Sequence, residues 1–271
     1  MGPVVVRHLN VSLANWPFAA DGLRIAHVSD LHLRTWNRVL KHTQQLLLGL
    51  EYDLLAVTGD LSHHPGDWAR AAELTRRLFS PLYASCGLFA VLGNHDSPRL
   101  AEAPELNLQF LRDEAVSVEY SQTTLAVAGV EQSMTGHGDV EAALAGIAPR
   151  TPAVLLAHYP STVYDVPPGQ VSLLLAGHTH GGQIRLPLLG CLWTNDRIPT
   201  RLARGLHIVD GTRLHASPGV GLSGPIPVRF RCRPEITMLR LWSLESKPSE
   251  TVFGLEEVEC EPELQKFALP V

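Results

Sequence analysis

Histidine, aspartate and asparagine residues occur in short clusters at five places along this chain, and their types suit metal binding. The clusters are Asp30-Leu31-His32, Gly59-Asp60, Gly93-Asn94-His95-Asp96, Ala157-His158 and Gly177-His178-Thr179-His180-Gly181-Gly182. Imidazole nitrogens, carboxylate oxygens and amide oxygens are ligands for divalent transition metals. The chemistry that these residues indicate is therefore a reaction assisted by bound metal ions.

The spacing within the clusters favours a site with more than one ion. Asp30 and His32 are separated by one residue, so on an extended strand end both side chains point to the same side. A carboxylate such as that of Asp60 can bridge two cations, and Gly59 before it permits close backbone approach. Metal-dependent hydrolysis of a phosphate ester at a two-metal site needs two cations about 3.5–4 Å apart, an activated water and a group that protonates the departing oxygen. The residues fit this list.

Each cluster directly follows an apolar run that we interpret as a buried strand. The runs cover residues 23–29, 54–58, 88–92, 153–157 and 171–176. Helical patterns at 36–49, 67–79 and 106–114 alternate with the first three, and this alternation predicts parallel strands. Further strand-like segments cover 116–119 and 124–130, with a short helix near 139–145. Asp, Asn and Gly also favour turns, but turn chemistry does not explain histidines at four strand ends.

The pattern changes after Gly182, where short apolar segments alternate with Gly and Pro. Strands are expected at 206–209, 213–216, 229–232 and 236–242, and we predict that they form a second, more antiparallel sheet. No linker or repeat interrupts the chain, so we expect a single domain over residues 1–244. Residues 245–271 are rich in glutamate, and we expect a solvated or loosely docked acidic tail.

Composition excludes several classes of protein. An apolar content of 45% over 271 residues is enough for a sizeable core. The absence of a long apolar run argues against a transmembrane helix, and the start lacks a signal-peptide pattern, so a cytoplasmic location is expected. A net charge of −5 disfavours a nuclease or another nucleic-acid partner. The four cysteines form no Cys-x-x-Cys pair, so we expect free thiols.

The clusters resemble the motifs of the calcineurin-like metallophosphoesterase family, over roughly residues 20–243. The stretches GHTHGGQIRLPLLG (177–190) and RCRPEITML (231–239) are similar to bacterial phosphodiesterases of the YkuE and YaeI type. The resemblance implies an α/β fold in the form of a four-layer αββα sandwich, with two mixed β-sheets flanked by helices and a dinuclear metal site.

The resemblance also implies a role for each residue. Asp30, His32, Asp60 and His180 would hold one metal, and Asp60 (as the bridge), Asn94, His158 and His178 would hold the other. His95 matches the family's general acid, with Asp96 placed to orient it. Hydroxide formed from a water between the cations would attack phosphorus while His95 protonates the leaving oxygen. Two divalent ions are expected, with manganese the first choice and iron or zinc the alternatives.

Substrate contacts are less defined. Arg185 is the arginine closest in sequence to the ligands, and His63 follows the Asp60 strand end, so both are candidate substrate contacts. Related phosphodiesterases commonly carry an arginine before the Gly-x-Gly near the C-terminal end, where Pro218 stands here. Another arginine would have to supply that phosphate contact. Two apolar loops, 186–193 and 220–228, could hold an acyl chain or touch a bilayer.

The reading favoured by the sequence is a metal-dependent phosphodiesterase that acts on a small-molecule or lipid-linked phosphoester, with peripheral membrane contact left open. One alternative is also a metal-dependent hydrolase, but it cleaves a pyrophosphate bond: a pyrophosphatase that acts on a lipid-linked nucleotide sugar of the UDP-diacylglucosamine type. Another is a non-catalytic binding scaffold of the same fold, which the intact ligand set argues against. The natural substrate and the oligomeric state are left open.

Overall fold

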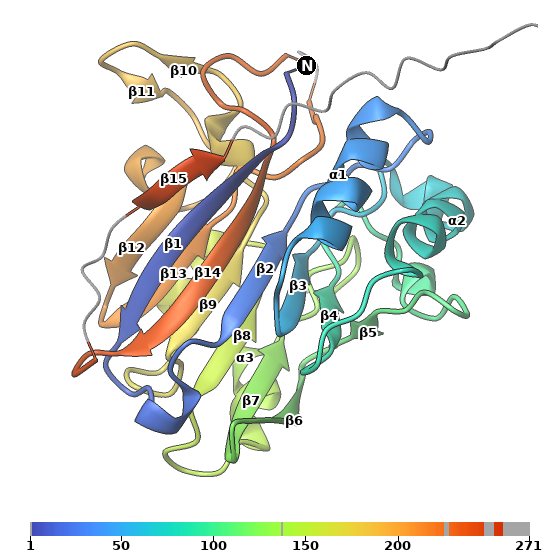
Figure 1. The fold of residues 1–271 in the computed structure, drawn as a ribbon. Helices are drawn as coiled ribbons and strands as arrows, with labels where there is room; N and C mark the ends of the chain where they lie inside the picture. Colours follow the sequence, from blue (N-terminus) through green and yellow to red (C-terminus); the bar gives the residue numbers. More distant parts are fainter. Residues whose placement is uncertain (1, 137, 225–227, 247–251, 257–271) are drawn as a thin grey trace, which may run out of the picture.

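Two mixed β-sheets pack face to face and carry helices on their outer faces (Figure 1). The structure is a computed structural model that describes residues 2–136, 138–224, 228–246 and 252–256. The larger sheet has the order β15 (Val252–Glu256), β1 (Val5–Leu13), β14 (Glu235–Ser243), β2 (Arg24–Val28), β3 (Leu54–Thr58), β4 (Leu88–Val91) and β5 (Gln109–Phe110). The smaller sheet has the order β12 (Gly205–Val209), β13 (Thr212–Ala216), β9 (Leu173–Ala176), β8 (Ala153–Leu156), β7 (Thr123–Gly129) and β6 (Glu114–Tyr120).

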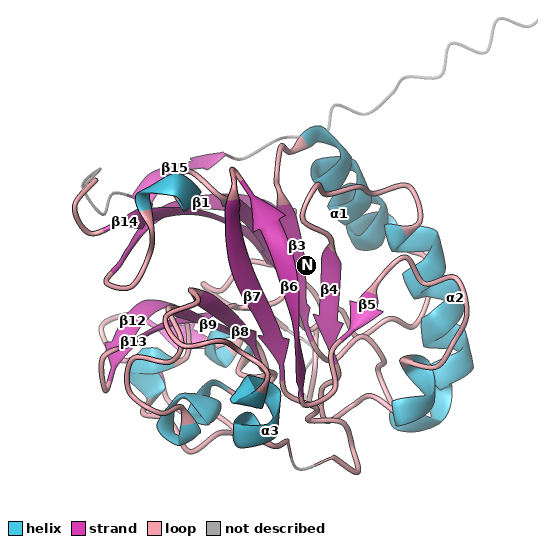
Figure 2. Ribbon diagram, turned by 90° about the horizontal axis from the view of Figure 1, so that it is seen from below, coloured by secondary structure: helices cyan, strands magenta, loops and turns pink. Residues whose placement is uncertain are grey.

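Helices cover the outer faces, as Figure 2 shows from below. The helices α1 (Arg38–Gly49) and α2 (Trp68–Phe79) lie on the larger sheet, and α3 (Val140–Ala145) lies on the smaller one. Short 3-10 helices lie between the strands at Phe18–Ala20, Pro65–Asp67, Pro98–Leu100, Pro160–Asp165, His180–Gly182 and Thr200–Leu202. The hairpin of β10 (Arg185–Leu186) and β11 (Gly190–Cys191) stands apart from both sheets.

The alternation of side chains along the strands builds the layers. In β3, Leu55 and Val57 pack against the two long helices, whereas Leu54 and Ala56 face the smaller sheet. The outer face of the smaller sheet packs on α3 and the Pro160–Asp165 turn in a third cluster. Strands buried on both faces read as continuous apolar runs, which explains the pattern at 54–58. The predicted four-layer αββα sandwich is confirmed.

Parallel pairing brings the strand ends that carry polar clusters to one edge. β2, β3 and β4 are parallel neighbours in the larger sheet, and β8 and β9 are parallel neighbours in the smaller one. In an α/β sheet the ends of parallel strands are where ligands bind, because the loops after them lie together.

The predicted helix over 106–114 is wrong. This segment instead contains β5 and the start of β6. Glu105, Asn107 and Asp113 have positive φ angles of 59°, 55° and 58°, a conformation that an α-helix does not accept. The Asn107 side chain also donates to the carbonyls of Phe79 and Leu82 at 2.8 and 2.9 Å, which ties the loop to the end of α2.

The four segments predicted after Gly182 (206–209, 213–216, 229–232 and 236–242) do not form the expected second sheet of their own. β12 and β13 extend the smaller sheet, where β13 runs parallel to β9. β14 returns to the larger sheet, parallel to β1 and antiparallel to β2. The predicted strand at 229–232 amounts to one bridge between Phe230 and Ile184. β1, which the sequence reasoning did not assign, contributes a full strand to the larger sheet.

The expected tail is in part a strand. Residues 252–256 form β15, which pairs antiparallel with β1 at the edge of the larger sheet. Residues 247–251 and 257–271, and with them Cys260, lie outside the described residues. The three cysteines that are described, Cys86, Cys191 and Cys232, are free thiols. Across the part of the chain that is described, no helix has both the length and the apolar character needed to cross a bilayer.

Two histidines are buried between the sheets just below the polar edge. His27 of β2 and His215 of β13 lie with their Nδ1 atoms 2.9 Å apart, and His27 Nε2 lies 2.8 Å from Thr58 Oγ1. Burial lowers the pKa of His27 to about 3 and holds that of His215 well below its ordinary value. Both rings are therefore neutral in the folded protein at pH values where an exposed histidine, with a pKa near 6.5, gains a proton.

This pair makes the stability depend on pH in a defined direction. Below about pH 6.5, His27 and His215 take up protons in the unfolded chain but stay neutral in the folded protein. The free energy of unfolding therefore falls as the pH falls. We expect His27→Gln to flatten the fall of the unfolding free energy between pH 6.5 and 5 by up to about 1.4 kcal/mol per pH unit. Urea denaturation at several pH values measures this slope. His64→Gln, at an exposed position, should leave the slope unchanged, and equal slopes in wild type and His27→Gln would contradict the account.

Candidate metal centre

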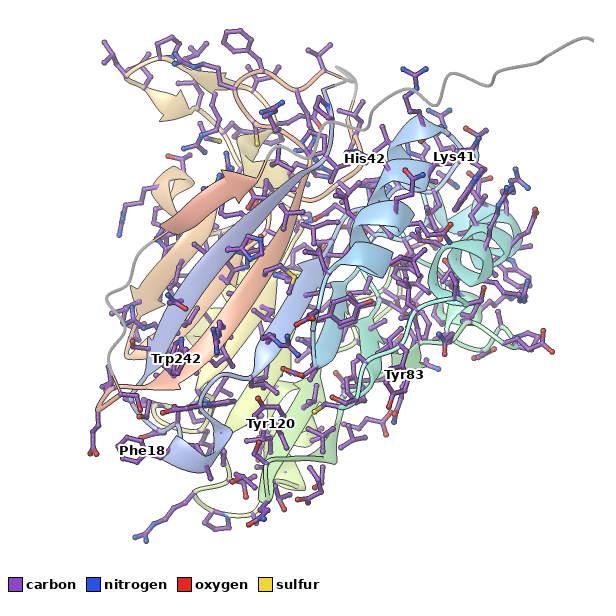
Figure 3. All side chains as sticks on the ribbon, in the orientation of Figure 1. Phe18, Lys41, His42, Tyr83, Tyr120 and Trp242 are labelled. Carbon is purple, nitrogen blue, oxygen red and sulfur yellow. The ribbon has the colours of Figure 1, made fainter. Side chains whose placement is uncertain are left out.

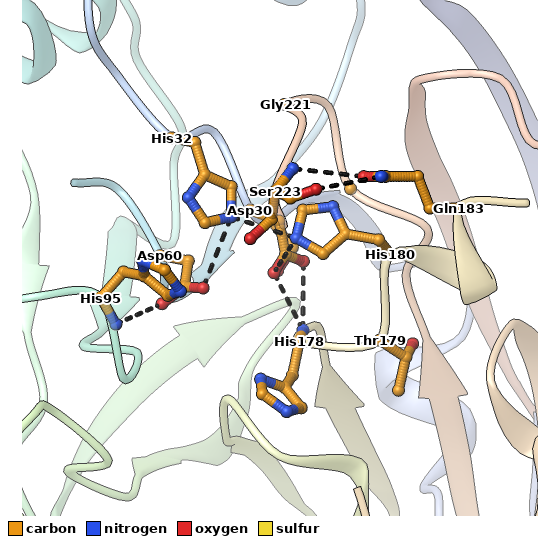
Figure 4. A network of polar contacts seen from close by, with 12 residues as sticks. Asp30, His32, Asp60, His95, His178, Thr179, His180, Gln183, Gly221 and Ser223 are labelled. Carbon is orange, nitrogen blue, oxygen red and sulfur yellow. Dashed lines mark hydrogen bonds and ion pairs between the residues drawn. The ribbon is translucent and has the colours of Figure 1, made fainter. Parts of the chain in front are cut away.

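The polar clusters come together at the C-terminal ends of parallel strands from both sheets. Figure 4 shows Asp30, His32, Asp60, His95, His178 and His180 close to one another. Asp30 and His32 follow β2, Asp60 follows β3, Asn94, His95 and Asp96 follow β4, His158 follows β8, and His178 and His180 follow β9. Strands far apart in sequence thus deliver side chains from both sheets to one place. All seven residues predicted as metal ligands lie there.

The ligand atoms form two groups that share one residue. Asp30, His32, Asp60 and His180 make up the first group, and Asp60, His158 and His178 make up the second. Within each group the atoms that could bind an ion all lie within 4.8 Å of one another, and every residue is buried. The shared residue is Asp60, whose two carboxylate oxygens face different groups. This arrangement has room for two cations with one carboxylate between them.

The distances around Asp60 show this division. Oδ2 of Asp60 lies 3.5 Å from His32 Nε2, and that nitrogen lies 3.0 Å from His180 Nε2. Oδ1 of Asp60 lies 3.3 Å from His158 Nε2. Asn94 Oδ1 lies 3.0 Å and His178 Nδ1 lies 3.2 Å from the same His158 nitrogen.

Contacts on the far side of two imidazoles fix which nitrogen carries the proton. His158 Nδ1 donates to the Thr58 carbonyl at 2.9 Å, and His178 Nε2 donates to the Asn195 carbonyl at 2.8 Å. In the neutral rings, His158 Nε2 and His178 Nδ1 therefore carry lone pairs. These lone pairs face each other beside the oxygens of Asp60 and Asn94. Four acceptors without a proton between them fit a cation, so the donor set suits a divalent metal.

Burial controls the charges of the ligands. Burial lowers the pKa of His32 to about 3 and that of His178 to about 4, so both rings keep a lone pair for a metal at pH 7. Burial raises the pKa of Asp30 to about 7, with a further contribution from the charge of Asp60. A nearby cation would favour the ionised carboxylates again.

The Asp60 carboxylate and the His158 imidazole attract each other across 3.3 Å. Burial opposes charge on both groups, but their mutual attraction outweighs it. That attraction lowers the pKa of Asp60 and raises the pKa of His158 to about 9. A proton on His158 would occupy the position that a metal needs, so proton and metal compete for this nitrogen.

The backbone around the ligands is strained in a consistent way. Five of the seven predicted ligands, Asp30, His32, Asp60, His178 and His180, have positive φ angles between 44° and 65°. Non-glycine residues rarely adopt this conformation, and it gathers at functional sites. Backbone bonds hold it, since His32 N donates to the Asp60 carbonyl at 2.9 Å and Asp30 N donates to the Gly59 carbonyl at 3.1 Å.

Glycines allow the loops to approach so closely. At Gly177 an added Cβ would collide with Ser29 Oγ and lie 2.6 Å from Asp30 Oδ2. At Gly93 it would collide with the Asp60 carboxylate and lie 2.8 Å from His158 Cε1. The glycines of the Gly-His-Thr-His and Gly-Asn-His-Asp clusters are therefore part of the site.

His95 lies beside the predicted ligands. Its ring is oriented by the His63 carbonyl and not, as the sequence had predicted, by Asp96. Its ring lies edge-on to His32 at 4.9 Å, and its Nδ1 donates to the His63 carbonyl at 2.8 Å. This bond leaves Nε2 as the nitrogen that can exchange a proton. The Asp96 carboxylate was expected to orient this ring. It instead accepts from the backbone N–H groups of Leu61, Ser62 and Gly93 at 3.2, 2.6 and 2.9 Å, and so holds the two loops together.

The two predicted substrate contacts lie at the periphery. The Arg185 guanidinium donates to the Gly181 carbonyl at 2.9 Å. The His63 ring lies edge-on to His32 at 5.8 Å, while its backbone carbonyl holds His95. Neither residue is among the described residues that line the pocket beside the metal centre. Their role toward a substrate stays a prediction.

Arg229 is the arginine that reaches the ligands, and the sequence reasoning missed it. Its guanidinium lies 3.3 Å from His180 Nδ1 and donates to the Gly221 carbonyl at 2.6 Å. The Gly221 loop follows Pro218, the position at which the resemblance implied an arginine. Gln183 and Ser223 join this loop to the histidine cluster by two bonds of 3.0 and 3.2 Å (Figure 4). The arginine-rich segment was the available signal, but spacing alone did not select Arg229.

A pocket of about 590 Å³ opens beside the ligands. Asp60, Asn94, His95, His178 and His180 line one part of it. Ile184, Leu186, Leu192 and Trp193 line another part, next to the β10–β11 hairpin. A phosphoryl group could thus lie at the metal ligands while an apolar group fills the neighbouring space.

Comparisons with known proteins show that the chain is similar to phosphoesterases. The model of the calcineurin-like phosphoesterase family matches residues 23–182. Phosphodiesterase YaeI of Escherichia coli is 30% identical, over 88% of this chain and 87% of its own. The metallophosphoesterase YkuE of Bacillus subtilis is 29% identical, over 84% of this chain and 82% of its own. UDP-2,3-diacylglucosamine pyrophosphatase LpxG of Chlamydia trachomatis is 26% identical, over 86% and 89%.

The close approach at Gly177 leads to a test of the site that does not depend on activity. We expect Gly177→Ala to bind at least one metal ion fewer per chain, because the new Cβ displaces Ser29 and Asp30. Elemental analysis of the purified protein measures the metal content, and circular dichroism checks folding. Gly146→Ala is the matched control, since Gly146 has a negative φ and an added Cβ there meets nothing within 4 Å. An unchanged metal content in a folded Gly177→Ala protein would refute the packing argument.

Proposed function

The chain belongs to the calcineurin-like phosphoesterase family and is a phosphoric ester hydrolase, and we propose that it cleaves phosphodiesters with two divalent cations held on either side of Asp60. The observation that carries the proposal is the sharing of one buried carboxylate by two groups of ligands. Asp30, His32 and His180 would complete one metal position. Asn94, His158 and His178 would complete the other. When bound, the cations supply an activated water and neutralise charge on the phosphoryl oxygens.

The side chains of the protein would then position the substrate and move the proton. His95 lines the pocket, and its Nδ1 is held by the His63 carbonyl, so Nε2 can donate a proton to the departing oxygen. Asp96 keeps the loops of β3 and β4 together through three backbone bonds, and so keeps His95 near Asp60. The guanidinium of Arg229 would place a positive charge next to His180, on the Nδ1 side of its ring.

The identity of the metal is part of the proposal. The proposed ligands are nitrogen and oxygen without sulfur, which suits manganese, iron or zinc better than calcium or magnesium. Manganese is our first choice, because the sequence resembles a family in which that ion is expected. The cytoplasmic location, the single domain over 1–244 and the oligomeric state stay predictions or open questions.

The role of His95 can be tested through the leaving group. We expect His95→Ala to lower kcat about 10²–10⁴-fold on a diester with an alkoxide leaving group. The loss should be much smaller on bis-p-nitrophenyl phosphate, because p-nitrophenolate departs without protonation. Steady-state kinetics on both substrates, with elemental analysis, measure this difference. Equal losses on the two substrates would contradict the general-acid role.

Asp60→Asn provides the contrasting variant. Replacing the shared carboxylate by an amide removes the charge that faces both ligand groups, so we expect the variant to lose bound metal as well as turnover on every diester. His95→Ala should keep its metal, because the His95 side chain is in neither ligand group. Equal metal content in the two variants would refute this division of roles.

A second candidate function is hydrolysis of the pyrophosphate bond of a lipid-linked nucleotide sugar. The apolar part of the pocket next to the ligands favours it, because Ile184, Leu186, Leu192 and Trp193 could receive an acyl chain. The similar LpxG protein is named as a UDP-2,3-diacylglucosamine pyrophosphatase, and that name is the second support. Both functions would use the same metal centre.

A substitution in the apolar part of the pocket separates the two functions. We expect Leu186→Asn to lower kcat/KM for UDP-2,3-diacylglucosamine about tenfold, since it places an amide where an acyl chain would pack. The same variant should hydrolyse bis-p-nitrophenyl phosphate at the wild-type rate. Paired assays on the two substrates make the measurement. Wild-type protein that hydrolyses the soluble diester but not the lipid pyrophosphate would remove the second candidate.

A further inference from the structure

The β10–β11 hairpin lies at one end of the molecule (Figure 1). Exposed apolar side chains are concentrated on this hairpin and on the neighbouring segment 228–230. We call this surface the apolar hairpin face; it consists of Leu188, Leu189, Leu192, Trp193, Val228 and Phe230, with exposed fractions of 107%, 69%, 63%, 73%, 53% and 49%. Backbone bonds join its two segments, since Arg185 N donates to the Phe230 carbonyl and Phe230 N donates to the Gln183 carbonyl, both at 3.0 Å. The face is therefore one surface built on a hydrogen-bonded framework.

The tip of the hairpin is unusual for a turn in water. Turns are normally built from Gly, Asn, Asp or Ser, which tolerate a left-handed backbone and solvate well. Here Leu188 adopts a φ of 66°, and its side chain is fully exposed. A leucine in this conformation at the tip of a turn is favoured neither by the backbone nor by water. Contact with an apolar phase would remove the cost of its exposure to water.

Other exposed apolar side chains are scattered over the molecule. Phe18 and Tyr83 lie apart from each other and far from the hairpin (Figure 3). Leu48 is on α1 and Ile208 is on β12. Single exposed apolar residues are normal on soluble proteins, whereas a contiguous group marks an interaction surface.

The charge around the apolar hairpin face differs from that of the whole chain. Residues 183–195 and 217–234 contain four arginines and no aspartate or glutamate, although the chain carries a net charge of −5. Of these arginines, Arg185, Arg229 and Arg233 are half-buried, and Arg229 points to His180. Arg231, at a φ of 52°, is exposed beside Phe230. Arginine next to apolar side chains is the combination that binds anionic lipid headgroups while apolar groups enter the acyl boundary. This complementarity points to a lipid surface.

The apolar hairpin face also continues into the pocket of the metal centre. Leu192 and Trp193 belong to both, and the same pocket is lined by His95 and His178. A molecule that is anchored in a bilayer could reach the ligands along this surface without passing through water. The position of the hairpin thus connects a membrane contact to the site of hydrolysis.

We propose that the apolar hairpin face docks on an anionic lipid bilayer, with Leu188 and Leu189 entering the interface and Arg231 contacting headgroups. This docking goes beyond the proposed function, because it assigns a surface and a partner and does not depend on which phosphoester is cleaved. The hairpin would then be the part of the described chain that contacts the membrane.

Vesicle binding by the full chain tests the proposal. Co-sedimentation with vesicles of phosphatidylcholine alone, and of phosphatidylcholine with one part in three phosphatidylglycerol, gives two binding curves. We expect binding that is stronger on the anionic vesicles, and a loss of at least tenfold in affinity for Leu188→Asp/Leu189→Asp, because the interface excludes the new charges. Neither residue lines the pocket of the metal centre, so this variant should turn over bis-p-nitrophenyl phosphate at the wild-type rate.

Leu48→Asp/Ile208→Asp is the matched control, since it places the same two charges at exposed leucine and isoleucine positions elsewhere. It should bind vesicles like the wild type. Wild-type protein that binds neither vesicle, or equal losses in the two double variants, would overturn the proposal. A dimer in light scattering that Leu188→Asp/Leu189→Asp dissociates, without vesicle binding by the wild type, would assign the face to a second copy of the chain and would also overturn it.

Discussion

Asp60 carries a buried carboxylate at the edge of the pocket. Its two oxygens face imidazole nitrogens that come from different sheets, one from His32 and the other from His158. Placing a carboxylate in such surroundings costs several kcal/mol unless opposite charge lies close by. Within the chain, that opposite charge comes chiefly from a proton on His158, whose attraction outweighs the effect of burial and lowers the pKa of Asp60. Two cations on either side of the carboxylate would take over this role, because a metal and a proton compete for the same nitrogen of His158. The arrangement of the ligand loops follows from this requirement.

The loops that surround Asp60 are strained, and the layers below them keep the strain in place. Five of the proposed ligands adopt a left-handed backbone conformation, at a cost of roughly 1–3 kcal/mol each. Three apolar clusters, on both faces of each sheet, provide the stability that such loops lack. The parallel strands β2, β3 and β4 carry the apolar side chains below and the polar ones at their ends. A rigid sandwich thus holds a strained edge, which is a common arrangement for chemistry.

The sequence predicts this edge well because apolar runs and polar clusters are local patterns. The runs before Asp30, Asp60, His158 and His178 are strands in the structure, and the four-layer fold follows from them. Predictions from local patterns were wrong where tertiary contacts determine the secondary structure or the pairing of strands. The segment at 106–114 has helical spacing, but left-handed residues and the Asn107 bonds turn it into a loop and strand ends. β14 belongs to the larger sheet because it pairs with β1. The two strands are far apart in the sequence, so no local pattern predicts this pairing.

Side-chain partners within the site were harder to predict than its ligands. Asp96 was expected to hold His95 because the two are adjacent, yet a strand-end turn directs the carboxylate to backbone amides instead. Arg229 reaches His180 from a loop that lies 49 residues further along the chain. Such contacts depend on how loops from different strands pack against each other. The sequence specifies the ligand types and their edge, and three-dimensional packing specifies the partners.

Anomalous diffraction from crystals of the manganese-loaded protein tests the central claim most directly. The account predicts two manganese peaks per chain, about 3.5–4 Å apart, with the Asp60 carboxylate bound to both. One peak should lie among Asp30, His32 and His180, and the other among Asn94, His158 and His178. A single peak, or two peaks that do not share Asp60, would contradict it.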